Sequence, residues 1–151
     1  MEQIIDRYNA LVGAAVVLLT AVFGAYWYLF AGYFLLNVFD WLSGWAKSRK
    51  LGKESSAAGL IGIVKKTGYW IIIAVAFLLA NVFTHLGQDL LGIDLSFLAL
   101  IGWYTLATLA VNEARSICEN FVEMGYDVPQ LLVSGLKVTQ EMIDKSSNKN
   151  A

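Results

Sequence analysis

Residues 67–86 read TGYWIIIAVAFLLANVFTHL, a stretch of 20 residues without Asp, Glu, Lys or Arg. A helix rises about 1.5 Å per residue, so this stretch is long enough to cross a hydrocarbon core of roughly 30 Å. Two further uncharged runs lie on either side of it, at residues 10–39 and 95–111. Hydrophobic residues make up 58% of the 151-residue chain, above the roughly 45–50% usual for soluble domains. We therefore expect an all-α integral membrane protein.

The first run is too long for one upright span. As a continuous helix, residues 10–39 would measure about 45 Å, beyond the thickness of the bilayer core. Gly24 is followed by Tyr26, Trp27 and Tyr28, an aromatic cluster typical of the headgroup interface. We therefore favour a turn there. The resulting prediction is a helical bundle with four spans, and a single tilted first helix, giving three spans, stays open. The four expected spans are residues 8–23, 28–46, 67–86 and 95–112.

Basic residues are concentrated between the second and third expected spans. Six of the 11 basic residues lie there: Lys47, Arg49, Lys50, Lys53, Lys65 and Lys66. Cytoplasmic loops carry an excess of Lys and Arg, so these residues should determine topology by keeping this loop inside. The turn at residues 87–94 contains Asp89 and Asp94 but no basic residue and should face outward. The last span then returns the C-terminus to the cytoplasm, and nucleic-acid binding is not implied.

The chain should continue as helix beyond the last apolar run. Residues 113–143 are expected to form a cytoplasmic helical region, interrupted where Gly125 and Pro129 favour a helix end. Its second part, residues 130–143, is amphipathic, and the polar residues 144–151 should be disordered. Residues 1–143 are thus expected to form a single membrane domain.

Asp40 is the most informative polar residue, because it follows about thirty uncharged positions. A carboxylate at membrane depth is costly unless it is paired, hydrated or protonated, and Lys65 and Lys66 are its expected partners. Two interpretations stay open: a contact in an assembled ring, or an interfacial carboxylate that sets helix depth. Gly44 shares a helix face with Asp40 and favours close helix approach.

Asn112 and Glu113 end the last apolar run and complete the candidate oligomerisation or pore residues. Arg115 and Glu119 are spaced for an i, i+4 ion pair. The sequence offers no catalytic constellation: His85 and Cys118 each stand alone, and no Gly-rich phosphate loop is present. We therefore expect no enzyme, no cofactor and no metal site.

Five short motifs follow one another along residues 28–136. They are Phe39-Asp40-Trp41-Leu42-Ser43-Gly44; Lys47-Ser48-Arg49-Lys50 with Ser55-Ser56; Gly62-Ile63-Val64-Lys65-Lys66; Asn112-Glu113-Ala114-Arg115-Ser116-Ile117-Cys118-Glu119-Asn120; and Gly125-Tyr126-Asp127-Val128-Pro129. The ordered set resembles the toxin-secretion and phage lysis holins of Gram-positive systems, whose Asp-Tyr-x-x-Gly pattern is matched by the first motif. Trp41 stands where that family usually has Tyr, and Ala114-Arg115 where a more apolar pair is common.

The resemblance implies a holin in the bacterial cytoplasmic membrane. Many copies would associate with one another in the bilayer and form lesions that release an endolysin or a toxin, without stable binding to that cargo. Two alternatives remain: a non-pore-forming anchor or scaffold of a secretion or envelope complex, and a small selective ion channel.

Overall fold

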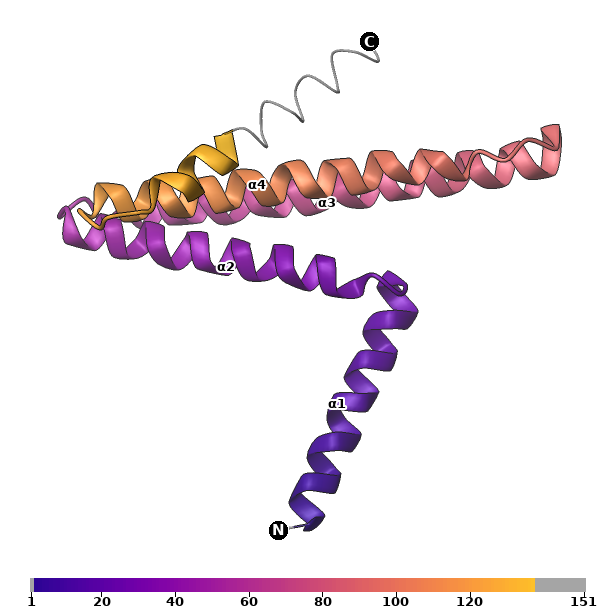
Figure 1. Cartoon of the computed structure of the whole chain (residues 1–151), viewed down its shortest axis with the longest axis horizontal. Coiled ribbons are helices and arrows are strands. Elements are labelled where there is room, and N and C mark those ends of the chain that lie inside the picture. Colours follow the sequence, from indigo (N-terminus) through magenta and orange to yellow (C-terminus); the bar gives the residue numbers. More distant parts are fainter. Residues whose placement is uncertain (1, 138–151) are drawn as a thin grey trace. The chain divides into compact units, whose positions relative to one another are not determined.

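The computed structural model describes residues 2–137, and every regular element in them is helical. The elements are α1 (Glu2–Phe23), α2 (Trp27–Lys50), α3 (Ser56–Leu86), the π-helical turn η1 (Gly87–Leu91), the 3₁₀ turn η2 (Ser96–Leu98) and α4 (Ala99–Glu123) (Figure 1). Residues 130–137 are also helical. The expectation of an all-α protein is confirmed for this part of the chain.

The chain divides into two compact units, Met1–Leu35 and Leu36–Ala151. In the first unit α1 ends at Phe23, and Gly24 takes a left-handed φ of 74° that side chains rarely adopt. The predicted break at Gly24 is confirmed, and the alternative of one continuous first helix is wrong. The described side chains of α1 from residue 5 onward are exposed, with Leu11 at 72%. An exposed apolar surface of this kind marks a contact with a membrane or with another protein.

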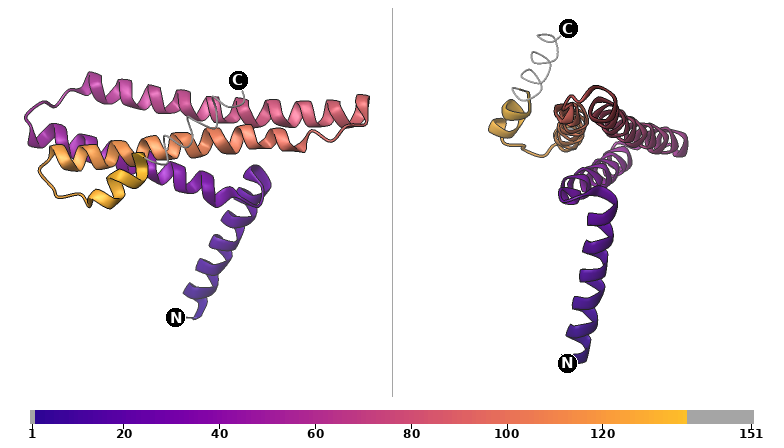
Figure 2. Two further views of the ribbon diagram at one scale, coloured as in Figure 1. Left: turned by 45° about the horizontal axis from the view of Figure 1, so that its top comes forward. Right: turned by 90° about the vertical axis from the view of Figure 1, so that its right-hand side faces the viewer.

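In the second unit α3 and α4 form an antiparallel hairpin and lie side by side in every view (Figures 1 and 2). Gly102 allows their closest approach, because a Cβ there would lie 2.6 Å from the Phe77 ring. That ring packs edge-on against Trp103, with centroids 4.9 Å apart. Ile73 and Leu106 are buried in the same unit. The hairpin is thus held by close packing, the main source of helix association in lipid.

A tight turn joins the two helices of the hairpin. Gly87 is buried there, and a Cβ on it would meet the Leu95 side chain at 2.7 Å. The Thr84 hydroxyl donates to the Leu95 carbonyl oxygen at 3.1 Å. The Asp94 carboxylate accepts a hydrogen bond from the Ser96 amide at 2.9 Å. Hydrogen bonds from the Ser96 backbone and side chain lower the pKa of Asp94, so the turn favours the ionised carboxylate.

Two helical stretches among the described residues are long and apolar enough to cross a membrane, Ser56–Leu91 and Ser96–Glu123. The expected count of four or three spans is therefore too high. In α2 the apolar sequence is interrupted by Asn37 and Asp40 and is rich in Trp and Tyr. In α1 the charged first turns leave 16 uncharged residues, at positions 8–23, fewer than the roughly 20 that a span needs.

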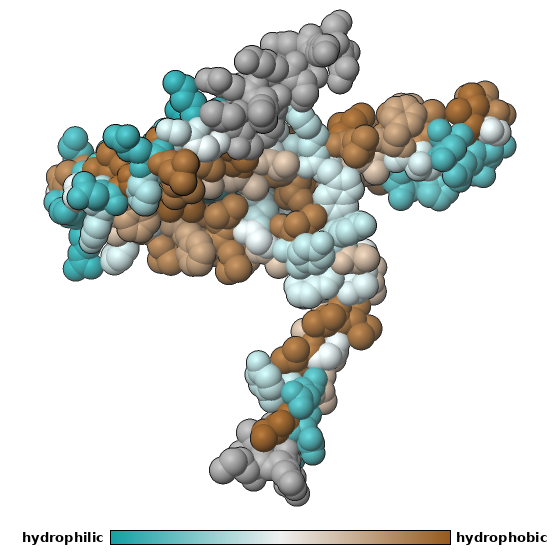
Figure 3. All heavy atoms as spheres, viewed as in Figure 1, coloured by the Kyte–Doolittle hydropathy of each residue, from teal (hydrophilic) through white to brown (hydrophobic). Residues whose placement is uncertain are grey.

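The surface of the second unit suits a hydrocarbon environment. Large apolar side chains of α3 and α4 are exposed, with Ile71 at 60% and Leu100 at 66%. Hydrophilic residues gather at the two ends of this unit (Figure 3). A soluble protein rarely exposes so much contiguous apolar surface, whereas a membrane span does so by necessity.

The predicted end of the last helix is confirmed. α4 continues past residue 111 to Glu123, and Gly125 follows with a left-handed φ of 83°. Within the predicted amphipathic segment, residues 130–137 are helical, and Leu131 is 86% exposed. The rest of that segment, 138–143, and the polar tail, 144–151, lie outside the described residues.

Candidate functional site

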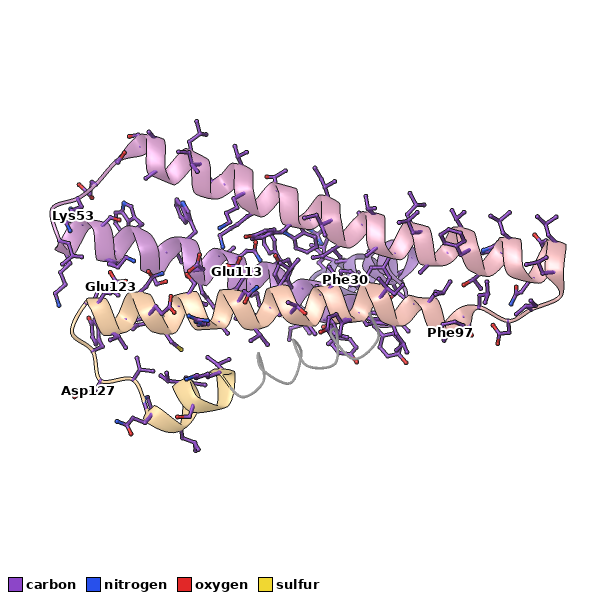
Figure 4. All side chains as sticks on the ribbon, turned by 90° about the horizontal axis from the view of Figure 1, so that it is seen from above. Phe30, Lys53, Phe97, Glu113, Glu123 and Asp127 are labelled. Atoms are coloured by element: carbon purple, nitrogen blue, oxygen red, sulfur yellow. The ribbon has the colours of Figure 1, made fainter. Side chains whose placement is uncertain are left out.

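Three helices of the second unit bring one ammonium group and two carboxylates together. Lys66 of α3 forms an ion pair with Asp40 of α2, with Nζ 2.9 Å from Oδ2. The same ammonium donates to Oε2 of Glu113 on α4 (Figure 4). The side chains of Asp40 and Lys66 are each 17% exposed, and that of Glu113 is 7% exposed. Charges this far from water are strongly destabilising unless they are paired.

Neutral side chains complete this polar network. The amide of Asn120 on α4 donates to Oδ1 of Asp40 at 3.2 Å and to the hydroxyl of Ser43 at 3.0 Å. Ser43 in turn donates to the backbone carbonyl oxygen of Asp40 at 3.1 Å. We call Asp40, Ser43, Lys66, Glu113 and Asn120 the polar network.

Helix geometry explains why these residues meet. Asp40 and Ser43 are three positions apart on α2, and Glu113 and Asn120 are seven positions apart on α4, so each pair shares a helix face. Lys66 immediately precedes residues 67–86, the uncharged stretch of 20 residues in α3. All three charges thus lie where the apolar sequence of their helices ends or is first interrupted by charge. The network marks one edge of the apolar layer.

A second set of contacts joins the ends of α2 and α4. Lys47 lies 3.4 Å from Glu123, and Lys50 donates to the backbone carbonyl oxygen of Met124, the C-cap of α4. A cation at this end of a helix is favourable, because it meets unpaired carbonyl groups. Arg49 stacks over the Trp45 ring at 5.3 Å. Two residues expected to set topology, Lys47 and Lys50, therefore also contact the end of α4.

Only some of the predicted site residues take part in the polar network. Lys66 is the partner of Asp40, whereas the Lys65 ammonium lies over the Tyr69 ring at 5.8 Å. Gly44 faces Asn120, whose amide nitrogen would be 3.6 Å from a Cβ at Gly44. Asn112 is exposed, unlike its neighbour Glu113. Lys53 is exposed as well.

The sequence did not single out Asn120, whereas it did predict the Arg115–Glu119 ion pair. Asn120 was not expected to be functional, although its spacing from Glu113 places both on one face of α4. The predicted pair of Arg115 and Glu119 is confirmed, with 2.8 Å between Nε and Oε1, but both side chains are more than half exposed. Such a pair contributes little to stability.

The polar network consists of ion pairs and hydrogen bonds between side chains. Within residues 2–137, no three side chains of His, Cys, Asp or Glu gather in a way that could hold a metal ion. The network satisfies its charges inside one chain.

The chain is similar to several bacterial proteins. An uncharacterised protein of Halalkalibacterium halodurans is 30% identical over 138 residues, which cover 91% of this chain and 95% of that protein. Uncharacterised proteins of Listeria monocytogenes and Listeria innocua are each 37% identical over 95 residues, 63% of this chain, and the match spans 59% of each Listeria protein. No solved structure matches the chain. Residues 17–141 match the bacteriophage holin family, and the chain belongs to that family.

Proposed function

We propose that this protein is a holin that oligomerises in the bacterial cytoplasmic membrane and forms lesions there. The lesions release an endolysin, which lyses the host, or a toxin. The observation that carries the proposal is the polar network, in which charges from three helices are satisfied inside one chain. We further assign the chain to the Asp-Tyr-x-x-Gly group of holins, with Asp40 and Gly44 as the matching residues, and we treat residues 1–143 as one functional domain.

The closed state follows from how the charges are paired. Asp40, Lys66 and Glu113 leave little charged surface for lipid while they contact one another. The exposed side chains of the α3–α4 hairpin, such as Ile71 and Leu100, are then free to meet acyl chains. A single copy can therefore accumulate in the bilayer without breaching it.

The open state uses the same groups. When copies associate, α2 separates from the hairpin, and the three charged side chains turn to water instead of one another. Hydration of these groups offsets the loss of their mutual contacts, because each ion regains solvent that burial had removed. The hydrated side chains then line the edge of the lesion, while the apolar surface of the hairpin stays against lipid.

Expression in bacteria tests the proposed function directly. Induction of the wild-type protein should abruptly collapse the membrane potential, and co-expression with an endolysin should lyse the culture. An intact potential at full membrane abundance would indicate an anchor or scaffold. Depolarisation without escape of the enzyme would indicate a selective ion channel.

Asp40→Asn tests the role of the network in timing. The variant should insert normally and lyse earlier than wild type, because the ion pair that joins α2 to Lys66 is lost. Lysis time is measured by culture density at equal membrane abundance. Asp89→Asn, the same chemical change in the exposed turn, is the matched control and should leave timing unaltered. Unchanged timing in Asp40→Asn would leave Asp40 as an interfacial anchor only.

A further inference from the structure

A cleft of about 710 Å³ opens between the ends of α2 and α3. The Asp40–Lys66 pair borders the cleft. The ribbon of α3 diverges from that of α2 toward the loop that contains Lys53 (Figure 4). The first ten residues of α3, at positions 56–65, are exposed apart from the half-buried Gly62. The cleft is therefore not filled by side chains of the second unit.

The walls of the cleft are mainly apolar. Trp41 and Trp45 line it from α2 and are 47% and 50% exposed. Gly59 and Gly62 line it from α3, and a Cβ at either position would meet no atom within 4 Å. Leu60 and Ile63 of α3 also line it. The cleft is thus a slot with two indole rings on one side and glycines with apolar side chains on the other, a shape that accepts a flexible hydrocarbon chain.

The rim of the cleft is polar and carries a replaceable cation. Lys47, Ser48, Glu54, Ser55 and Ser56 line it there. The Lys47 ammonium is 3.4 Å from Glu123, whose side chain is 54% exposed. An exposed pair of this kind is weak, so Lys47 can exchange its carboxylate partner for another anion.

Depth and charge indicate what that anion is. Residues 67–86 of α3 account for a hydrocarbon core of roughly 30 Å, so the part of the cleft at Gly59 and Gly62 lies about 7–12 Å beyond its edge. Tryptophan favours this headgroup layer. The surrounding stretch, residues 46–66, contains six basic residues and one acidic residue, Glu54. Basic pockets between helices on the cytoplasmic side are suited to anionic lipid headgroups.

We propose that this cleft binds an anionic phospholipid of the inner leaflet. An acyl chain lies between the indole rings and the glycine face of α3, and the phosphate is held by Lys47 with the serine hydroxyls of the rim. The proposal rests on the inward orientation of the basic loop that belongs to the proposed function. A bound lipid would push α2 away from the start of α3. This movement would also affect the polar network, which lies at the other end of the cleft.

Native mass spectrometry of the full chain in detergent tests the headgroup preference. The probes are phosphatidylglycerol and phosphatidylcholine with identical acyl chains, titrated separately. Wild type should retain phosphatidylglycerol at severalfold lower concentration than phosphatidylcholine. Lys47→Gln should weaken phosphatidylglycerol binding about fivefold. Lys65→Gln removes the same charge from a residue that does not line the cleft and should weaken it much less.

A second pair of variants tests the location. Gly62→Leu fills the cleft and should abolish tight phosphatidylglycerol binding, whereas Gly68→Leu, on the same helix with equally open space around its Cβ, should preserve it. Equal retention of the two lipids by wild type would overturn the proposal. Equal effects of the two lysine variants on lipid binding would also overturn it, and so would equal effects of the two glycine variants. Loss of a dimer rather than of lipid in Gly62→Leu would assign the cleft to a second copy. Lipid retention is measured without lysis, so failure of this inference is distinguishable from failure of the holin function.

Discussion

Lys66 holds two carboxylates, and the network depends on it more than on any other residue. Its ammonium contacts both Asp40 and Glu113, on different helices. Lys66→Met would preserve most of the side-chain volume but leave both acids without a cation. Removal of one partner from a buried pair costs about 3–5 kcal/mol. We expect a loss of this order in the free energy of unfolding, measured by denaturant titration in mild detergent.

Lys65→Met is the matched control for this prediction. Lys65 is exposed, and its ammonium lies over the Tyr69 ring. An exposed contact of this type contributes about 1 kcal/mol or less. A triple variant, Lys66→Met with Asp40→Asn and Glu113→Gln, should recover part of the lost stability, because no unpaired charge remains. Similar stabilities of the two single variants would show that Lys66 is not buried in the network.

Asp94 gives the turn between α3 and α4 a dependence on pH. Hydrogen bonds from Ser96 lower the pKa of the Asp94 carboxyl below its usual value of 3.8. The ionised form therefore stabilises the turn above the usual pKa, and this contribution is lost as the pH falls through the lowered pKa. The group is fully exposed, so the effect is local. In wild type the Ser96 amide should become less protected from hydrogen exchange in acid, after correction for the intrinsic rate, whereas Asp94→Asn should abolish this change.

At the scale of elements, Gly102 controls the α3–α4 hairpin. A Cβ at this position would lie within 2.7 Å of three atoms of the Phe77 ring. Gly102→Val should therefore separate the helices and destabilise the hairpin by roughly 1–3 kcal/mol, the usual effect of overpacking. Thermal unfolding in detergent measures the change.

Two further variants make this prediction specific. Phe77→Ala in the Gly102→Val background removes the clashing ring and should restore part of the stability. Gly68→Val introduces the same side chain into α3 where a Cβ meets nothing within 4 Å, and it should have little effect. Equal losses from Gly68→Val and Gly102→Val would reflect β-branching in a helix rather than packing of the hairpin.

Local sequence signals predicted the helix ends well. The break at Gly24 and the end of α4 before Gly125 both depend on glycine at a positive φ. Such a glycine can be recognised from its immediate neighbours in the sequence. The number of spans was harder to predict. The run at residues 10–39 appeared long enough for two spans, but Asn37 and Asp40 follow one another closely in α2, and the Trp and Tyr residues there are only weakly apolar.

The site was predicted in part. The pairing of Asp40 with Lys66 followed from the topology of the loop, because both residues were expected at the same face of the membrane. The burial of Glu113 and the contribution of Asn120 could not be predicted, since they depend on the rotation of α4 against α2. The rotation of α4 about its own axis is set by tertiary packing, such as that of Gly102 against Phe77 of α3, and a single sequence does not show which helix faces meet.

At the scale of the whole molecule, the distribution of charge along the chain predicts an orientation with the basic loop inside. Basic residues gather between residues 46 and 67, whereas the turn at residues 87–94 contains two acidic residues and no basic ones. The positive-inside bias is counted over short loops of this kind. Lys47 and Lys50 also bind the end of α4, so the segment after α4 is held on the same side as the basic loop.

Cysteine labelling tests this orientation. In a Cys118→Ser background, Gln88→Cys places one thiol in the exposed turn, and Lys53→Cys places one in the exposed loop between α2 and α3. A membrane-impermeant maleimide applied to intact spheroplasts before lysis should label the thiol at position 88 and spare the one at 53. Permeabilised cells, in which both should react, are the control. The reverse pattern would place the basic loop outside, where both the proposed phospholipid site and the release of an enzyme from the cytoplasm would lose their physical basis.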